Sequence, residues 1–219
     1  MYRHTRDEML RTIEQEAAMI GVMTGRGAVS SRVMRAMADV PRERFVPEHL
    51  RVDAYGNFPL PIGNGQTISQ PFIVALMTDL LETRPEHKVL EVGTGSGYQA
   101  AVLSQLVEQV YSLERISTLA AAARHLLEAF GYFNVEVCDG DGYQGLLEHA
   151  PYDGIIVTAA APDIPPALLT QLKPGGRMVI PVGQPYSHQE LVVVKKHSSG
   201  KDQRESVLDV AFVPMVQGG

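Results

Sequence analysis

The strongest chemical signal in the sequence is a glycine-rich turn that follows a short apolar run. Residues 88–92 read as a strand, glycines follow at positions 93, 95 and 97, and a helical pattern begins at Tyr98. Glycine has no side chain to obstruct a ligand that approaches the backbone. In open α/β sheets, nucleotides bind at such a turn beyond the carboxyl end of a central strand. The candidate ligand-binding residues here are Gly93, Thr94, Gly95 and Gly97.

Acidic residues stand at the ends of the next two predicted strands. Glu114 ends the strand-like run that follows the glycine turn, and a carboxylate there can accept hydrogen bonds from both hydroxyls of a ribose. The third run leads into Asp139-Gly140-Asp141-Gly142. In that segment the Asp141 carboxylate can bind an adenine amino group, and a backbone amide can reach a ring nitrogen. Two plainer interpretations stay open, namely a solvated strand end for Glu114 and a tight turn for the Asp-Gly segment.

The spacing of the glycines and one further carboxylate indicate which nucleotide is bound. The dinucleotide fingerprint is Gly-x-Gly-x-x-Gly, whereas this turn reads Gly-x-Gly-x-Gly and has Tyr98 at the third fingerprint position. Glu91, just before the turn, would repel a pyrophosphate but would favour a cationic sulfonium or ammonium group. Glu91, the glycines, Glu114 and Asp141 together resemble the S-adenosylmethionine site of the seven-stranded methyltransferases.

The segment after the fourth predicted strand indicates the kind of methyl acceptor. Methyltransferases that act on amino groups of bases carry an Asn/Asp-Pro-Pro-aromatic loop there, but residues 157–162 read Val-Thr-Ala-Ala-Ala-Pro. This small, smooth wall suits an extended peptide backbone. The sequence shows no general base and no metal-ligand spacing. A carboxylate acceptor needs no base, because its pKa of about 3–4 leaves it ionised at neutral pH.

Several longer segments resemble one methyltransferase family in particular. Residues 60–71, 40–46, 156–162, 174–176 and 212–215 occur in the order expected of the protein-L-isoaspartate O-methyltransferases, in their bacterial form. The block Thr-Ile-Ser-Gln-Pro at 67–71 is the most specific of these segments, since other methyltransferases lack it. The resemblance spans residues 30–216, and the first thirty residues carry little of it.

The resemblance implies a repair activity and assigns roles to residues. The family transfers a methyl group from S-adenosyl-L-methionine, leaving S-adenosyl-L-homocysteine, to the free α-carboxylate of isoaspartyl residues in damaged proteins. The ester then re-forms a succinimide, part of which opens to normal aspartate. Ser69 matches the active-site serine and orients the acceptor, although a serine shortly before Pro71 is also suited to capping a helix. The resemblance adds Thr67, Ile68, Arg115, Gly140 and Gly142 to the cofactor site, and Thr158, Ala159, Ala160, Val213 and Pro214 to the substrate site with Ser69.

The elements that position these residues follow from hydrophobic periodicity. Helices are predicted at residues 5–20, ended by Gly21 and Gly25, from Ser30 or Ser31 to about Pro41, and after Pro71, with an irregular connection over 44–66. Strands at 88–92, 110–114, 135–138, 152–158 and 177–182 alternate with helices near 98–107, 116–130 and 166–172. Runs at 191–195 and 207–213, separated by the polar residues 197–203, read as a hairpin.

These elements predict an α/β fold. It is a doubly wound, mostly parallel sheet with an antiparallel C-terminal hairpin and N-terminal helices, seven-stranded and Rossmann-like if the chain is a class I S-adenosylmethionine-dependent methyltransferase. We expect residues 1–86 to pack on a cofactor-binding core at 87–219 as one compact unit.

Composition excludes several other classes of protein. The 219 residues carry 19 basic and 25 acidic side chains, a net charge of −6 that argues against nucleic-acid binding. Neither a membrane span nor a secretory signal is expected. Cys138 is the one cysteine, expected in a buried strand, and fits a reducing, cytoplasmic setting. We expect a monomer without a metal. Three alternatives remain: another carboxyl or small-molecule methyltransferase, a nicotinamide-dependent oxidoreductase, and a silent cofactor-binding protein.

Overall fold

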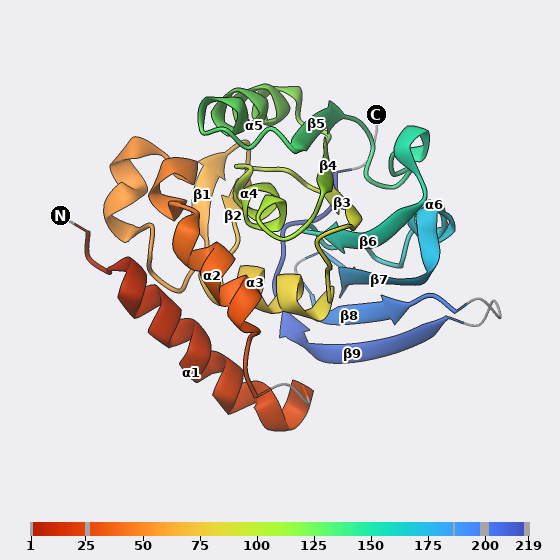
Figure 1. Ribbon diagram of the computed structural model, residues 1–219, viewed down its shortest axis with the longest axis horizontal. Coiled ribbons are helices and arrows are strands. Elements are labelled where there is room, and N and C mark those ends of the chain that lie inside the picture. The colour runs from red at the N-terminus through yellow and green to blue at the C-terminus, as the bar shows by residue number, and fades with distance from the viewer. Residues whose placement is uncertain (1, 25–26, 186, 198–201, 217–219) are drawn as a thin grey trace.

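The computed structural model describes residues 2–24, 27–185, 187–197 and 202–216. Among these residues, seven strands form one sheet in the order β5-β4-β3-β6-β7-β8-β9, and β1 and β2 form a separate pair (Figure 1). The strands are β1 (Leu60–Gly63), β2 (Gln66–Ile68), β3 (Lys88–Val92), β4 (Gln109–Glu114), β5 (Val135–Asp139), β6 (Tyr152–Val157), β7 (Leu172–Gly183), β8 (Gln189–Lys195) and β9 (Gln203–Val210). The α-helices are α1 (Arg6–Thr24), α2 (Ser31–Asp39), α3 (Pro71–Leu80), α4 (Tyr98–Ser104), α5 (Ser117–Ala129) and α6 (Pro166–Gln171). Three short 3₁₀ helices are η1 (Arg42–Phe45), η2 (Glu48–Asp53) and η3 (Leu147–His149).

The topology confirms the fold predicted from the sequence. Strands β5, β4, β3, β6 and β7 pair in parallel, whereas β8 pairs antiparallel with both β7 and β9. Parallel neighbours require crossover connections, which the intervening helices supply. The predicted C-terminal hairpin is therefore β8 and β9 at one edge of the sheet (Figure 1).

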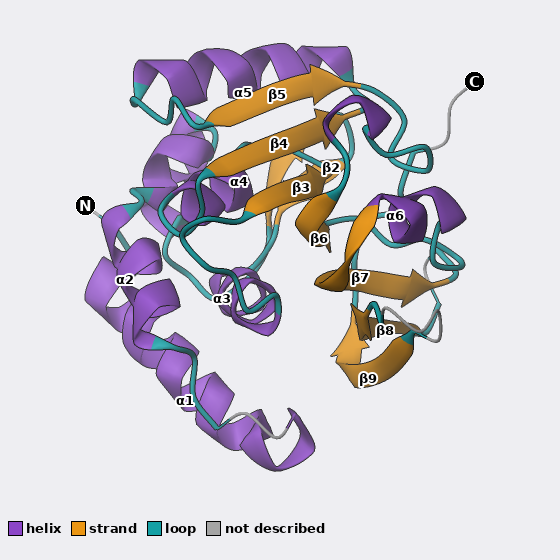
Figure 2. Cartoon of the chain, turned by 45° about the vertical axis from the view of Figure 1, so that its right-hand side comes forward, coloured by secondary structure: helices purple, strands orange, loops and turns teal. Residues whose placement is uncertain are grey.

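Both faces of the sheet are buried, which explains the apolar strand sequences. In β3, Val89 belongs to one buried cluster and Leu90 to the other, because successive side chains of a strand point to opposite faces. Leu168 of α6 contributes to the second cluster, whereas helices α1 to α5 contribute to the first. Figure 2 shows α6 on the other side of the twisted sheet from α3, α4 and α5.

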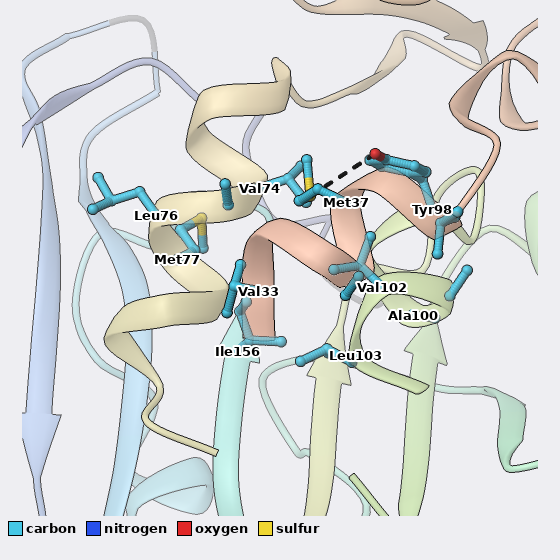
Figure 3. Packing of buried hydrophobic residues seen from close by; sticks show 14 of the residues in the cluster. Val33, Met37, Val74, Leu76, Met77, Tyr98, Ala100, Val102, Leu103 and Ile156 are labelled. Atoms are coloured by element: carbon cyan, nitrogen blue, oxygen red, sulfur yellow. Dashed lines mark hydrogen bonds between the residues drawn. The ribbon is translucent and has the colours of Figure 1, made fainter. Parts of the chain in front are cut away.

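The N-terminal helices bury their apolar stripes against the first cluster. Met37 of α2 is fully buried beside Tyr98 of α4, and Met77 of α3 is buried in the same cluster (Figure 3). The Tyr98 hydroxyl contacts the Met37 sulfur at 3.9 Å. No helix in the described part of the chain is long and apolar enough to cross a lipid bilayer.

Two predictions for the N-terminal segment are wrong. Helix α1 continues through Gly21 to Thr24, because a glycine costs a helix only about 1 kcal/mol and the buried stripe of α1 outweighs that cost. Gly25 lies outside the described residues. The connection predicted as irregular contains the end of η1, all of η2, and most of the β1–β2 hairpin. Asn64 and Gly65 both have positive φ and form the two-residue turn of that hairpin.

Boundaries near the C-terminus also differ from the predicted ones. Strand β7 begins at Leu172 and passes through Pro174–Gly176 with a register shift, so it is longer than predicted. Strand β9 begins at Gln203 and ends at Val210, so residues 211–213 follow the strand instead of completing it. The predicted loop at 197–203 lies partly outside the described residues. Cys138 lies in β5 but is only partly buried, and that burial raises its pKa to about 11.

Candidate active site

The glycine turn adopts a backbone that requires glycine. Gly93, Gly95 and Gly97 have φ values of +98°, +53° and +85°, a region that other residues rarely occupy. A Cβ on Gly93 would lie 2.4 Å from the Thr158 hydroxyl oxygen. That hydroxyl donates a hydrogen bond to the Gly93 carbonyl oxygen at 2.6 Å, which ties the turn to the end of β6. The turn is therefore rigid at the point where β3 ends.

Glu114 holds the glycine turn in place and faces the cavity beside it. One carboxylate oxygen accepts a hydrogen bond from the Gly95 amide at 2.8 Å, and the other accepts from the Ile116 amide at 2.9 Å. Each carboxylate oxygen has a second lone pair, so the group can still accept bonds from two hydroxyls. The predicted role of Glu114 toward a ribose is compatible with these contacts.

Glu91 lies beneath the turn and contacts it through a chain of hydroxyls. Its carboxyl group is fully buried and accepts a hydrogen bond from Ser112, whose oxygen lies 2.6 Å from the Thr94 hydroxyl. Burial raises the pKa of Glu91 to about 8, the Ser112 bond opposes this and the charge of Glu114 adds to it. The other oxygen of Glu91, Oε1, has no hydrogen-bond partner among the described residues. This buried oxygen therefore receives no hydrogen bond from the described residues.

The end of β5 supplies a second backbone surface. The Gly140 amide donates to the Glu114 carbonyl at 2.9 Å, and the Asp141 carboxylate accepts from the Tyr143 amide at 2.9 Å. Asp141 therefore stabilises a tight turn, which is the plainer of the two interpretations of this segment. Gly142 lines a cavity, and a Cβ on it would come within 2.6 Å of Val92 Cγ1.

The cavity beside the turn, called here the glycine-turn pocket, has a volume of about 50 Å³. Ten of the predicted site residues line it: Thr67, Gly93, Gly95, Glu114, Arg115, Gly142, Thr158, Ala159, Val213 and Pro214. Gln66, Val92, Leu113, Ile116, Met215 and Val216 also line it but were not predicted. Met215 could have been found, because it stands in the family-like segment at 212–215.

Two further cavities adjoin the glycine-turn pocket. An inner cavity of about 30 Å³ is lined by Ile68, Ser69 and Thr94, among others. A large groove of about 750 Å³ runs between α1, α3 and β9 and is also lined by Ser69. Thr67 and Thr158 line all three cavities. The glycine-turn pocket and the groove therefore meet at these two threonines.

Ser69 is not the N-cap of helix α3, so the alternative interpretation as a helix cap is wrong. The N-cap of α3 is Gln70, which makes no side-chain capping bond. Instead, the Asn57 side chain accepts a hydrogen bond from the Phe72 amide at 3.1 Å in the first turn of α3. Ser69 lines both the inner cavity and the groove.

A buried arginine fixes the backbone of Ser69 from behind. Arg42 is fully buried and donates hydrogen bonds to the carbonyl oxygens of Ala54 and Ser69, both at 2.7 Å. Its guanidinium lies 4.8 Å from the centre of the Tyr98 ring, a cation–π contact. Burial lowers the pKa of Arg42 to about 10. Arg42 stands in the family-like segment at 40–46, but its contact with Ser69 could not be read from the sequence.

The remaining predicted residues lie near the cavities without lining any of the three. They are Glu91, Gly97, Gly140, Asp141 and Ala160. Ala160 is buried and forms a parallel bridge with Pro214, so it places the C-terminal segment beside the pocket. Among the described residues, one exposed group could hold a metal ion, His188 with Glu190 and Asp209, and only Asp209 lines the groove.

The groove also contains residues that were not among the predicted site residues, although Gln70 and Phe212 stand in the family-like segments 60–71 and 212–215. These unpredicted residues are Glu16, Ile20, Pro59, Gln70, Phe72, Ile73 and residues 208–212. Glu16 and Ile20 come from α1, a segment to which the sequence assigned no function. Helical periodicity predicted that helix, but it did not identify which of its residues border a groove.

Comparison with known proteins places these features in context. Residues 14–219 match the family model of protein-L-isoaspartate(D-aspartate) O-methyltransferase. The chain is 56% identical over 217 residues to protein-L-isoaspartate O-methyltransferase 2 of Syntrophobacter fumaroxidans, covering 99% of this chain and 88% of that protein. It is 58% identical over 192 residues to the protein of the same name from Polaromonas sp., covering 88% and 91%.

Solved structures show the same fold. A structure of a protein-L-isoaspartate O-methyltransferase superposes with a TM-score of 0.82 at 29% identity, covering 98% of this chain and 66% of that one. A putative protein-L-isoaspartate O-methyltransferase from Plasmodium falciparum, in complex with S-adenosyl-L-homocysteine, gives a TM-score of 0.81 at 21% identity. That match covers 99% of this chain and all of that one.

Proposed function

The chain belongs to the protein-L-isoaspartate(D-aspartate) O-methyltransferase family, and from that premise we infer the reaction it performs. It transfers a methyl group from S-adenosylmethionine to the α-carboxylate of an L-isoaspartyl residue. In such a residue the backbone runs through the side chain, which leaves the α-carboxylate free. Methoxide leaves the ester far more readily than oxide leaves a carboxylate, so the neighbouring amide nitrogen can close the succinimide with release of methanol, which starts the return to normal aspartate.

The residues around the glycine turn fit the chemistry of S-adenosylmethionine. Glu114 lines the glycine-turn pocket with lone pairs free for the two ribose hydroxyls, and Gly142 presents backbone to the same pocket without a side chain. The unpartnered oxygen of Glu91 lies in the layer below, where a negative charge would stabilise a nearby cation. When bound, the cofactor supplies a methyl group made electrophilic by the positive charge on its sulfur.

The acceptor requires positioning and does not require a base. An α-carboxylate has a pKa of about 3–4 and is already ionised at neutral pH. Ser69, at the wall of the groove, donates a hydrogen bond that orients this carboxylate, while Thr158 borders the same space. Alignment of reacting groups accounts for up to roughly 7–11 kcal/mol of barrier lowering in favourable intramolecular reactions. Rate acceleration by this chain therefore rests on holding Ser69 and the glycine turn in fixed relation.

One observation carries this proposal, namely that Thr67 and Thr158 border both the glycine-turn pocket and the groove. A cofactor in the pocket and a peptide in the groove would meet there. The test is transfer of labelled methyl from S-adenosylmethionine to an isoaspartyl peptide and to its matched aspartyl peptide. Methylation of the isoaspartyl peptide alone supports the proposal. Equal methylation of both peptides, or of neither, overturns it.

We also propose the setting in which the chain works. Its substrates are isoaspartyl proteins and peptides, and residues 1–86 and 87–219 act as one unit because both line the groove. The net charge of −6 favours neither nucleic acid nor anionic membranes as partners, and the single cysteine suits the cytoplasm. A monomer suffices for this site, and light scattering at micromolar concentration tests it.

A further inference from the structure

A buried glutamine of β8 bonds the backbone of the segment that follows β9. Gln189 is the first residue of β8 and is only 3% exposed. Its side-chain oxygen accepts a hydrogen bond from the Phe212 amide at 2.7 Å, and its side-chain nitrogen donates to the Phe212 carbonyl oxygen at 3.1 Å. The two residues therefore satisfy each other, since both backbone groups of Phe212 meet both ends of one buried amide side chain.

These two bonds replace a strand partner that the sheet does not provide. Strand β9 ends at Val210, which pairs with Gln189, and the same antiparallel register would place Ser187 opposite Phe212. The Ser187 amide instead bonds the Gln184 carbonyl at 3.2 Å, in the connection between β7 and β8. An amide side chain donates and accepts at once, as a strand backbone does. Gln189 thus continues the pairing beyond the end of the ladder.

Beyond Phe212 the chain passes to a second support. The Ala160 amide donates a hydrogen bond to the Val213 carbonyl at 2.8 Å, and the Met215 amide donates to the Ala160 carbonyl at 2.8 Å. Ala160 follows the end of β6, so these bonds fix the C-terminal segment beside the sheet. The segment is therefore held at two successive points, by Gln189 at Phe212 and by Ala160 from Val213 onward.

The segment held in this way forms a wall of both the groove and the glycine-turn pocket. Residues 208–213 line the groove, and residues 213–216 line the pocket. Gln189 lines neither of them, so it acts on these spaces through Phe212. Because Phe212 and Ser69 line the same groove, a displacement of Phe212 changes the space in which an acceptor at Ser69 is held.

We propose, on the basis of the function proposed above, that Gln189 is a positioning residue for methyl transfer, which fixes Phe212 and thereby the groove wall that the isoaspartyl peptide contacts. Catalysis by alignment is sensitive to such a wall, since a misplacement of about 1 Å can lower a rate roughly 100-fold. Gln189 serves the peptide more than the cofactor, because Ala160 still bonds Val213 and Met215 beside the glycine-turn pocket when the Gln189 side chain is changed.

A second buried glutamine provides a matched control. Gln171, the last residue of α6, is 4% exposed. Its side chain accepts a hydrogen bond from the Leu146 amide at 2.8 Å and donates to the Gln144 carbonyl at 2.7 Å. None of these three residues lines the groove, the glycine-turn pocket or the inner cavity. The two glutamines therefore make the same kind of bonds at similar burial, but only Gln189 supports the groove.

The test replaces each glutamine by Met, which keeps the length and removes both bonds, and by Asn, which keeps the amide but is one methylene shorter. For an isoaspartyl peptide, kcat and KM are measured at saturating cofactor, at a temperature where the variants compared are folded. All four variants should melt about 2–8 °C lower than the wild type. The Gln189 variants should also raise the peptide KM and lower kcat/KM by about 10- to 100-fold, with cofactor affinity unchanged. The Gln171 variants should keep the wild-type kcat/KM.

Hydrogen exchange measures the proposed bond directly. The Phe212 amide should exchange faster in Gln189→Met than in the wild type or in Gln171→Met, because its acceptor has been removed. If Gln189→Met does not fold, Gln189→Asn provides the same comparison. An unchanged exchange rate at Phe212, a wild-type kcat/KM in the Gln189 variants, or an equal loss in the Gln171 variants overturns the inference and leaves the proposed function intact. A wild type that methylates no isoaspartyl peptide overturns the proposed function, and the inference with it.

Discussion

Replacing Glu91 by Gln is expected to stabilise the cofactor-free protein, and to do so increasingly as the pH rises from 5 to 8. Burial raises the pKa of Glu91 from its ordinary 4.5 to about 8. Below pH 4.5 the carboxyl group is protonated in both the folded and the unfolded state, so it brings no penalty. Above that pH the unfolded state ionises first, and stability is lost until the folded group also ionises near pH 8.

The size of the effect follows from the difference between the two pKa values. Each unit of difference corresponds to about 1.4 kcal/mol, so the wild type should be less stable than the Gln variant by about 3 kcal/mol at pH 7. At pH 5 the difference should be under about 1 kcal/mol. Glutamine keeps the shape of the side chain and can still accept the Ser112 hydrogen bond, so the comparison isolates the charge.

Urea unfolding followed by circular dichroism at pH 5, 6, 7 and 8 measures this difference. The matched control is Glu86→Gln, since Glu86 is exposed and its charge meets no burial penalty. A stability difference between wild type and Glu91→Gln that does not change with pH would refute the reasoning. Calorimetry adds a second measurement, because a cationic ligand that favours ionised Glu91 should release a proton on binding below pH 8.

Four further predictions concern the site. Glu114→Ala should weaken S-adenosylmethionine binding in calorimetry by about 1.5–3 kcal/mol for each lost charged hydrogen bond, and an unchanged affinity would remove Glu114 from the site. Ser69→Ala should keep cofactor affinity but lose about 10- to 1,000-fold in turnover. At saturating cofactor, the wild-type kcat/KM for the peptide should be nearly flat from about pH 6 to 8, and a steep rise through pH 7 would reveal a base. Arg42→Met should lower the melting temperature by stranding the buried carbonyls of Ala54 and Ser69, at about 1–3 kcal/mol each, and should reduce kcat as well as stability. A kcat equal to that of the wild type at a temperature where the variant is fully folded would show that Arg42 serves the fold alone.

Residues whose role depends on local backbone geometry could be predicted from the sequence. The glycine turn has positive φ at positions that other residues rarely tolerate, and Glu114 follows at the end of the next strand. The β1–β2 hairpin carried its own signal, because Asn64-Gly65 is a preferred two-residue turn. The prolines and glycines around it predicted an irregular segment instead, and strands of four and three residues are too short to show a period.

Residues whose role depends on tertiary packing could not be predicted. Ser112 supports the turn only because β4 lies beside β3 with Ser112 opposite Glu91. Glu16 borders the groove only because α1, near the start of the sequence, packs close to β9, near its end. Neither relation leaves a periodic or compositional trace in the chain.

The burial of Arg42 has a consequence for how the protein orders itself. A guanidinium leaves water at a large cost unless its partners are already in place, and here the partners are carbonyls from two separate segments. The segment around Ala54 and the segment around Ser69 therefore become ordered together, as one cooperative unit. We expect hydrogen exchange to show the amides of both segments opening with the same free energy. Under mild denaturant, catalytic competence and N-terminal structure should then disappear at the same concentration, with no species that keeps one and lacks the other.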